Sequence, residues 1–162
     1  MTMVYSTHEI FEIAIQIERN GAAFYRRASH LAPDKASRTM LASLAKMEDD
    51  HEATFIAMRD AASLGGEPRD DEMLGYIRSM ADSHVFDTGM DPDAILSGKE
   101  TIEEILSTAI GLEKESVVYY AALKEVIADE QTRRRLQAII LEEMGHIAEL
   151  SGRRQAVRGS GG

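Results

Sequence analysis

The sequence predicts an all-α fold, a four-helix bundle made of two helical hairpins that are joined by a long crossover. Apolar residues recur at three- and four-residue spacing over four long stretches, and few β-branched residues alternate with polar ones. At 1.5 Å per residue each stretch is roughly 35–45 Å long, the length of a bundle helix. Short connections join the stretches within each pair, whereas residues 64–99 separate the two pairs and suit a crossover.

Capping and breaking residues set the expected ends of the helices. The expected helices, in chain order, cover residues 7–30, 34–63, 70–82, 100–128 and 130–157. Ser6 or Thr7 caps the first helix and Pro33 follows it, and glycines and a proline follow the second. One domain is expected over residues 1–158, with its crossover at about 64–99 and a disordered tail at 159–162.

Composition and charge argue against several classes of protein. The chain has no cysteine, which excludes disulfides, thiolate catalysis, Cys-ligated zinc and iron–sulfur clusters. Its formal net charge of −10 argues against a nucleic-acid partner, since phosphate binding needs a basic face. No apolar stretch is long enough to cross a membrane and no secretory signal is visible, so no membrane partner and a cytoplasmic location are expected.

An internal repeat relates the two hairpins at an offset of 95 residues, the separation of Glu18 and Glu113. At this offset residues 9–25 align with 104–120 without a gap. The polar residues that the repeat retains are Glu9 with Glu104, Glu18 with Glu113, Tyr25 with Tyr120, Glu48 with Glu143, and His51 with His146. Glu9 and Glu104 lie in first turns, where they favour the helix dipole, and are interpreted as structural. The other pairs are of the kinds that bind metal ions.

Two of the retained pairs form the same motif, Glu-x-x-His, at Glu48–His51 and Glu143–His146. Residues three apart share one helix face, so each motif can hold a metal ion, and the surrounding apolar stripes direct it into the bundle. With one further glutamate from each of the other helices, Glu18 and Glu113, this is the ligand arrangement of di-iron carboxylate bundles. Two divalent ions would neutralise four carboxylates that are costly to bury alone, and carboxylate with imidazole suits iron or manganese.

On these residues the chain resembles the rubrerythrin-like branch of the ferritin-like superfamily. The resemblance implies a four-helix bundle around a centre of two iron ions that reacts with peroxide or dioxygen; manganese or zinc could substitute. It implies three roles for the six candidate ligands: bridging for Glu48 and Glu143, terminal for Glu18 and Glu113, and capping one ion each for His51 and His146. It also implies that Tyr25 and Tyr120, each seven residues after a ligand, donate hydrogen bonds to ligand carboxylates.

Two features depart from that branch. Without cysteine the chain lacks a rubredoxin domain, so electrons must come from a separate donor. Peroxide-reducing members place a further glutamate where this chain has Ser116, and the repeat-equivalent residue is Gly21. Glu115, two residues after a ligand, is expected to point to a different face. The departure argues against reduction of peroxide by ligand exchange, while the small residues leave room for a diatomic ligand.

Three functions stay open, and no catalytic residue is assigned. The favoured one is a di-iron oxidoreductase that reduces dioxygen or hydrogen peroxide. The alternatives are an iron-handling protein, a ferroxidase or a store, and a non-enzymatic metal-binding assembly module. A homodimer is expected from the resemblance and because the crossover could be exchanged between chains.

Overall fold

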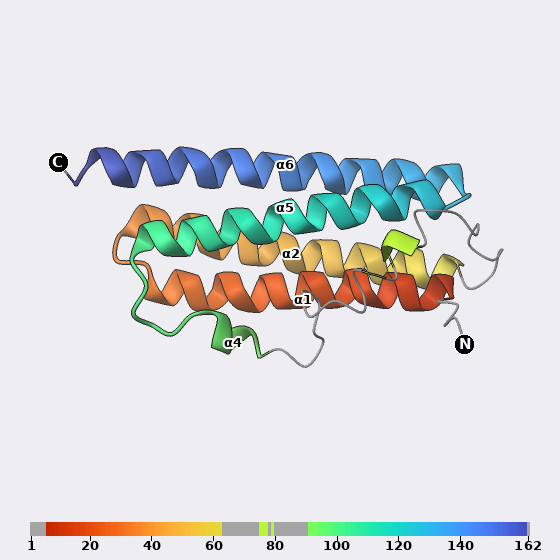
Figure 1. Ribbon diagram of the computed structural model, residues 1–162, viewed down its shortest axis with the longest axis horizontal. Coiled ribbons are helices and arrows are strands. Elements are labelled where there is room, and N and C mark those ends of the chain that lie inside the picture. Colours follow the sequence, from red (N-terminus) through yellow and green to blue (C-terminus); the bar gives the residue numbers. More distant parts are fainter. Residues whose placement is uncertain (1–5, 63–74, 78, 80–90, 162) are drawn as a thin grey trace.

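The computed structural model describes residues 6–62, 75–77, 79 and 91–161 of the 162-residue chain (Figure 1). In this described part of the chain, four long helices run side by side along the molecule. The helices are α1 (Thr7–Leu31), α2 (Lys35–Ala62), a short α4 (Pro92–Ile95), α5 (Ile102–Val126) and α6 (Glu130–Gly159). In the described part of the chain the fold is all-α, as the sequence predicts.

The long helices form two antiparallel hairpins. In Figure 1, α1 and α2 run in opposite directions, as do α5 and α6, and the two hairpins lie against each other. The α2 helix ends at one end of the bundle and α5 begins at the opposite end, so their connection spans its length. Of the short helix expected over 70–82, residues 75–77 and 79 are helical and the others lie outside the described residues. Two hairpins joined by a crossover are therefore confirmed.

The first helices of the two hairpins begin with the same capping box. Ser6 Oγ accepts the backbone N–H of Glu9 at 3.2 Å, while a Glu9 carboxylate oxygen accepts the N–H of Ser6 at 2.6 Å. Thr101 and Glu104 make the equivalent bonds at 3.2 and 2.7 Å. Each box satisfies two N–H groups that the first turn leaves unpaired. The structural role predicted for Glu9 and Glu104 is thus this capping.

The start expected for the third long helix at residue 100 is wrong by two residues. Glu100 lies outside α5, where its carboxylate accepts the N–H and hydroxyl of Ser97 at 2.6 and 2.8 Å and the N–H of Gly98 at 2.9 Å. Gly98 has a φ of 88°, which favours glycine. The bonds from Ser97 hold the pKa of Glu100 at about 2. At the C-terminal end of the chain, α6 extends to Gly159, the residue at which the disordered tail was expected to begin.

The hydrophobic core consists of two clusters, one toward each end of the bundle. One cluster includes Ile10, Phe55 and Tyr119, and the other includes Phe24 and Leu106. On every long helix the buried Glu and His residues come between the positions that contribute to one cluster and to the other. The fold thus encloses a polar layer in the middle of an apolar bundle. Along the described chain, no helix combines the length and the apolar character needed to cross a membrane.

Asp34 joins the turn between α1 and α2 to the C-terminal part of α6. Its carboxylate accepts the N–H of Ser37 at 2.8 Å and a guanidinium N–H of Arg153 at 2.5 Å, and Arg153 also donates to the Ser37 hydroxyl at 2.9 Å. We expect Asp34→Ala to lower the free energy of unfolding by about 1–2 kcal/mol, the cost of losing a helix cap, as measured by urea titration. Unchanged stability would contradict this.

The contribution of Asp34 to the free energy of unfolding should decrease as the pH falls. The N–H of Ser37 in the first place, aided by Arg153, lowers the pKa of Asp34. A carboxyl group with a lowered pKa stabilises the fold above its ordinary pKa, and the stabilisation is lost as the pH falls through the lowered value. The difference between wild type and Asp34→Ala should therefore shrink in acid, which the same titration at pH 3 measures.

Candidate metal centre

All six residues that the sequence singles out as ligands meet in the polar layer. The α1 and α5 helices each contribute one glutamate, and α2 and α6 each contribute a Glu-x-x-His pair. The six are Glu18, Glu48, His51, Glu113, Glu143 and His146, and none is more than 4% exposed. These six side chains point inward because each occupies a buried position in the apolar stripe of its helix.

These side chains form two overlapping groups of donors. One contains Glu18 and His51 and the other Glu113 and His146, and in each group the donor atoms lie within 4.8 Å of one another. Glu48 and Glu143 belong to both groups. They occupy the shared position that the resemblance implied for bridging carboxylates.

The two imidazoles face the shared carboxylates with their Nδ1 atoms. His51 Nδ1 lies 2.8 Å from Glu143 Oε1 and 3.6 Å from Glu18 Oε2. His146 Nδ1 lies 3.4 Å from both Glu113 Oε1 and Glu143 Oε2. The rings stack with their centroids 5.9 Å apart. The two halves of the sequence repeat are thus related by a pseudo-twofold axis, with one histidine from each half beside a shared group of carboxylates.

Two buried tyrosines donate hydrogen bonds to Glu113 and Glu18 from across the bundle. The Tyr25 hydroxyl of α1 donates to Glu113 Oε1 of α5 at 2.5 Å, and the Tyr120 hydroxyl of α5 donates to Glu18 Oε1 of α1. The resemblance implied that the two tyrosines donate hydrogen bonds to ligand carboxylates. It did not indicate that each tyrosine donates to a glutamate of the other hairpin. Each bond fixes one carboxylate orientation, and in Glu18 the other oxygen, Oε2, has no hydrogen-bond partner.

Unsatisfied polar atoms test whether the site fits metal ions. Among the described residues, eight buried side-chain nitrogen or oxygen atoms have no hydrogen-bond partner. Seven of them belong to Glu18, Glu48, His51, Glu143 and His146. Such atoms are rare in folded proteins because each costs about 1–3 kcal/mol. Divalent cations would supply partners for those of these atoms that face the centre, so the donor set fits two of them.

The carboxylates do not share one ionisation state in the metal-free site. Burial, followed by repulsion from the neighbouring carboxylates, raises the pKa of Glu48 well above its ordinary value. Burial is also the largest cause that raises the pKa of Glu113 to about 8. The pKa of Glu143 is instead lowered, because the nearby imidazoles of His146 and His51 stabilise its charged form by more than burial destabilises it. Glu143 is therefore the carboxylate of the cluster that most favours the ionised form.

The histidines carry protons too. Burial alone would lower the pKa of His51, but the Glu143 and Glu18 carboxylates outweigh it and raise the pKa to about 11. The same balance, with Glu113 and Glu143 as the partners, raises the pKa of His146 to about 9. At neutral pH the metal-free site holds protons on groups that must lose them to bind a metal ion.

A cavity of about 50 Å³ adjoins the centre on the side of α1, α4 and α5. Its lining residues are Ile17, Asn20, Gly21, Tyr25, Glu48, Ile95, Leu112, Glu113, Glu115 and Ser116. A single water needs about 10–15 Å³ of such space, so the cavity accommodates a molecule of two heavy atoms. The room expected from the two small residues, Gly21 and Ser116, therefore lies beside the centre.

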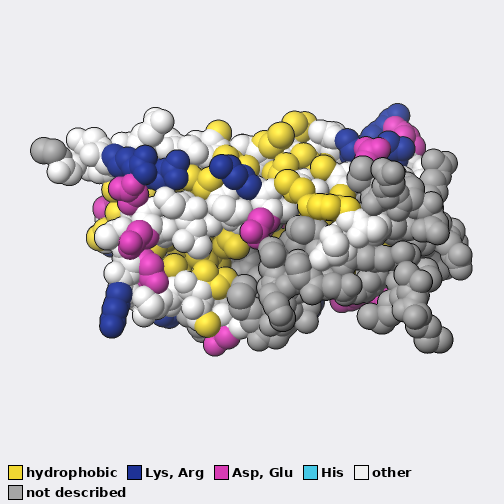
Figure 2. Space-filling view, viewed as in Figure 1, with side chains coloured by type: hydrophobic (Ala, Val, Ile, Leu, Met, Phe, Trp, Pro, Cys, Tyr) yellow, Lys and Arg dark blue, Asp and Glu magenta, His cyan; other side chains and the backbone are white. Residues whose placement is uncertain are grey.

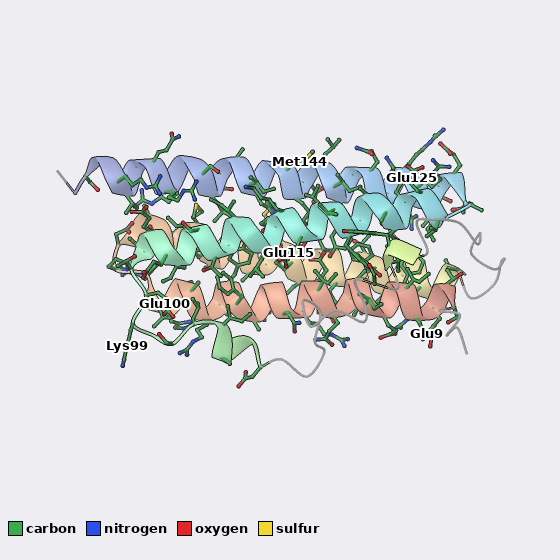
Figure 3. The ribbon with its side chains drawn as sticks, in the orientation of Figure 1. Glu9, Lys99, Glu100, Glu115, Glu125 and Met144 are labelled. Carbon is green, nitrogen blue, oxygen red and sulfur yellow. The ribbon has the colours of Figure 1, made fainter. Side chains whose placement is uncertain are left out.

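Glu115 borders this cavity although the sequence placed it on a different face from Glu113. Its side chain is exposed whereas that of Glu113 is buried, and Figure 3 shows it on the side of α5 nearest α1. Spacing along α5 alone could not reveal the cavity, which α1 and α4 help to form.

Gly21 is required by the position of a carboxylate. A Cβ atom at residue 21 would lie 2.5 Å from Glu48 Oε2, so that oxygen would have to move. We expect Gly21→Ala to weaken metal binding about tenfold or more while the helix stays folded, as measured by calorimetry with Mn²⁺. Gly111→Ala is the matched control, since a Cβ there meets nothing within 4 Å. Equal affinity in the two variants would contradict the assignment of Glu48.

Comparison with known proteins adds a structural likeness. No protein-family profile matches the sequence, and no curated protein matches it. The structure is similar to that of a candidate ferritin-like diiron-carboxylate protein from Thermotoga maritima, with a TM-score of 0.71. The likeness covers 96% of this chain and 98% of the other at 23% sequence identity. This chain has a ferritin-like fold. The fold places the buried Glu/His cluster among its four long helices.

Proposed function

We propose that the protein is a di-iron oxidoreductase of the rubrerythrin-like branch that reduces dioxygen or hydrogen peroxide at its four-Glu, two-His centre. The observation that carries the proposal is the set of seven unpartnered buried donor atoms beside a cavity that fits a two-atom molecule. Structural zinc sites use four ligands and stay closed, whereas six ligands for two ions leave positions open to a substrate.

The proposal assigns metal binding to the six buried residues, in the roles implied by the resemblance. Glu48 and Glu143 would bind both ions, Glu18 and His51 one, and Glu113 and His146 the other. Bound iron ions would supply two electrons, which with two protons reduce one hydrogen peroxide to two waters, and a separate donor would return the electrons. Reduction of dioxygen to water needs two further electrons from that donor.

The chain's own residues hold and shield the centre. The two apolar clusters exclude water from the ends of the site, which strengthens the electrostatic interactions within it. Tyr25 and Tyr120 fix Glu113 and Glu18 by hydrogen bonds, so these ligands need little reorganisation. The cavity at Gly21 and Ser116 would admit the oxidant.

Mixing the anaerobic Fe²⁺-loaded protein with each oxidant, and following Fe³⁺ absorbance, tests this function. We expect oxidation much faster than that of free Fe²⁺ in the same buffer, with no large preference for peroxide because residue 116 is serine. Ser116→Glu should raise the peroxide rate selectively, since its carboxylate would lie beside the centre. Oxidation no faster than in buffer would contradict the function, and a wild-type preference for peroxide by orders of magnitude would contradict the role given to Ser116.

A second candidate function, the oxidation of iron as cargo, is favoured by Glu115. Its exposed carboxylate borders the cavity that leads to Glu48 and Glu113, where it could attract Fe²⁺ from solution. A ferroxidase would oxidise many equivalents of added Fe²⁺ and release or store the product. An oxidoreductase would stop after two equivalents per chain unless a reductant is present, so iron titration under air separates the two.

Further proposals concern partners and location. Figure 2 shows hydrophobic side chains over α5 and α6, where Val118, Leu141 and Met144 are at least half exposed. This surface supports a homodimer, which sedimentation velocity would detect. We also propose a separate electron donor, a cytoplasmic location, and neither nucleic acid nor membrane as a partner.

A further inference from the structure

The two halves of the centre differ outside their ligands. His51 Nε2 lies 2.7 Å from a carboxylate oxygen of Glu142, which comes from α6 in the other hairpin. His146 Nε2 is buried and has no partner among the described residues. On the side away from the centre, one imidazole therefore has a hydrogen-bond partner and the other has none among the described residues.

The difference is encoded in the sequence. Glu142 directly precedes the Glu-x-x-His motif of α6, and the residue that precedes the motif of α2 is Met47. Met47 and Glu142 are 95 residues apart and therefore correspond in the repeat. His146 thus has a methionine at the position that, for His51, provides a carboxylate. The repeat retains all six ligands and both tyrosines and loses its symmetry here.

A carboxylate on the far nitrogen changes what an imidazole does as a ligand. An Nε2–H that donates to Glu142 leaves Nδ1 with its lone pair toward the centre and fixes the ring plane. His51 Nδ1 lies closer to its nearest carboxylate oxygen than His146 Nδ1 does, at 2.8 against 3.4 Å. The Glu142 side chain is itself 54% exposed, so it remains solvated while it supports a buried ligand.

We infer that Glu142 is the positioning residue of His51, and that the metal position of Glu18 and His51 fills before that of Glu113 and His146. The inference rests on the proposed metal centre and adds an order of loading to it. The first ion would bind where the imidazole is already oriented, and the second where it is not. Partners of this kind typically change metal affinity by about 10- to 100-fold.

Calorimetric titration of the metal-free protein with Mn²⁺ at fixed pH tests the inference. We expect two steps in the wild type, separated by about 10- to 100-fold in affinity. Glu142→Met, which copies the α2 residue, should weaken the first step until the two merge at unchanged stoichiometry. Glu142→Gln should recover much of the loss, because its amide oxygen still accepts the N–H. Glu149→Met removes an exposed glutamate elsewhere on α6 and should change neither step.

A spectroscopic signal separates positioning from a general structural effect. In the diamagnetic Zn²⁺-loaded protein, NMR should detect one slowly exchanging imidazole N–H for His51, and Glu142→Met should abolish it. Two equal steps in the wild type, or a Glu142→Met titration identical to wild type, would overturn the inference while leaving the metal centre in place. Failure of the wild type to bind two ions would instead refute the proposed function.

Discussion

The Glu48→Ala, Glu143→Ala double variant should bind neither metal ion. These two residues belong to both donor groups, so their removal takes a ligand pair from each. Wild-type protein in Mn²⁺ at a thousand times its dissociation constant should gain about 4 kcal/mol of stability per site, and the variant should gain none. Thermal unfolding with and without Mn²⁺ measures the difference.

The fold itself should tolerate this change. Without metal, buried carboxylates destabilise the helices that carry them, so their removal should leave the helical circular dichroism intact. A matched control removes two exposed glutamates from the other faces of α5 and α6, as Glu125→Ala with Glu149→Ala. The control should keep both ions. A double variant of Glu48 and Glu143 that still holds two ions would refute the bridging assignment.

Metal binding should release protons at pH 7. The pKa values of Glu113, His146 and His51 are raised to about 8, 9 and 11, and that of Glu48 is raised well above its ordinary value. All four groups must lose a proton to become ligands. Addition of Mn²⁺ to metal-free protein in weak buffer, with a pH indicator, counts the protons directly.

The same four groups determine how the metal affinity changes with pH. Because their pKa values are raised, protons compete more strongly as the pH falls, and affinity falls with it. The product of the two binding constants should therefore decrease steeply as the pH falls below 8. Affinity that is independent of pH between 6 and 8 would contradict a buried, protonated cluster.

The sequence was sufficient to predict the fold class and to single out the residues of the cluster. Repeated Glu-x-x-His motifs and apolar stripes are local patterns, and helical periodicity converts them directly into positions on a face. A structural role for Glu9 and Glu104 followed in the same way from their place in first turns, although the capping boxes that they form were not predicted.

Features that depend on contacts between helices could not be predicted. The crossing of Tyr25 to Glu113 and the support of His51 by Glu142 join residues about ninety positions apart, for which spacing has no rule. The need for Gly21 arises from a carboxylate on another helix. The start of α5 was misplaced for a local reason, since Glu100 caps the preceding turn instead of entering the helix.

The central claim is that two metal ions bind among the six buried side chains. Elemental analysis of protein produced in iron-supplemented cells, with protein concentration determined by amino-acid analysis, measures this directly. The account predicts two iron ions per chain in the wild type and none in the Glu48→Ala, Glu143→Ala variant. One ion per chain, or the same content in both proteins, would contradict it.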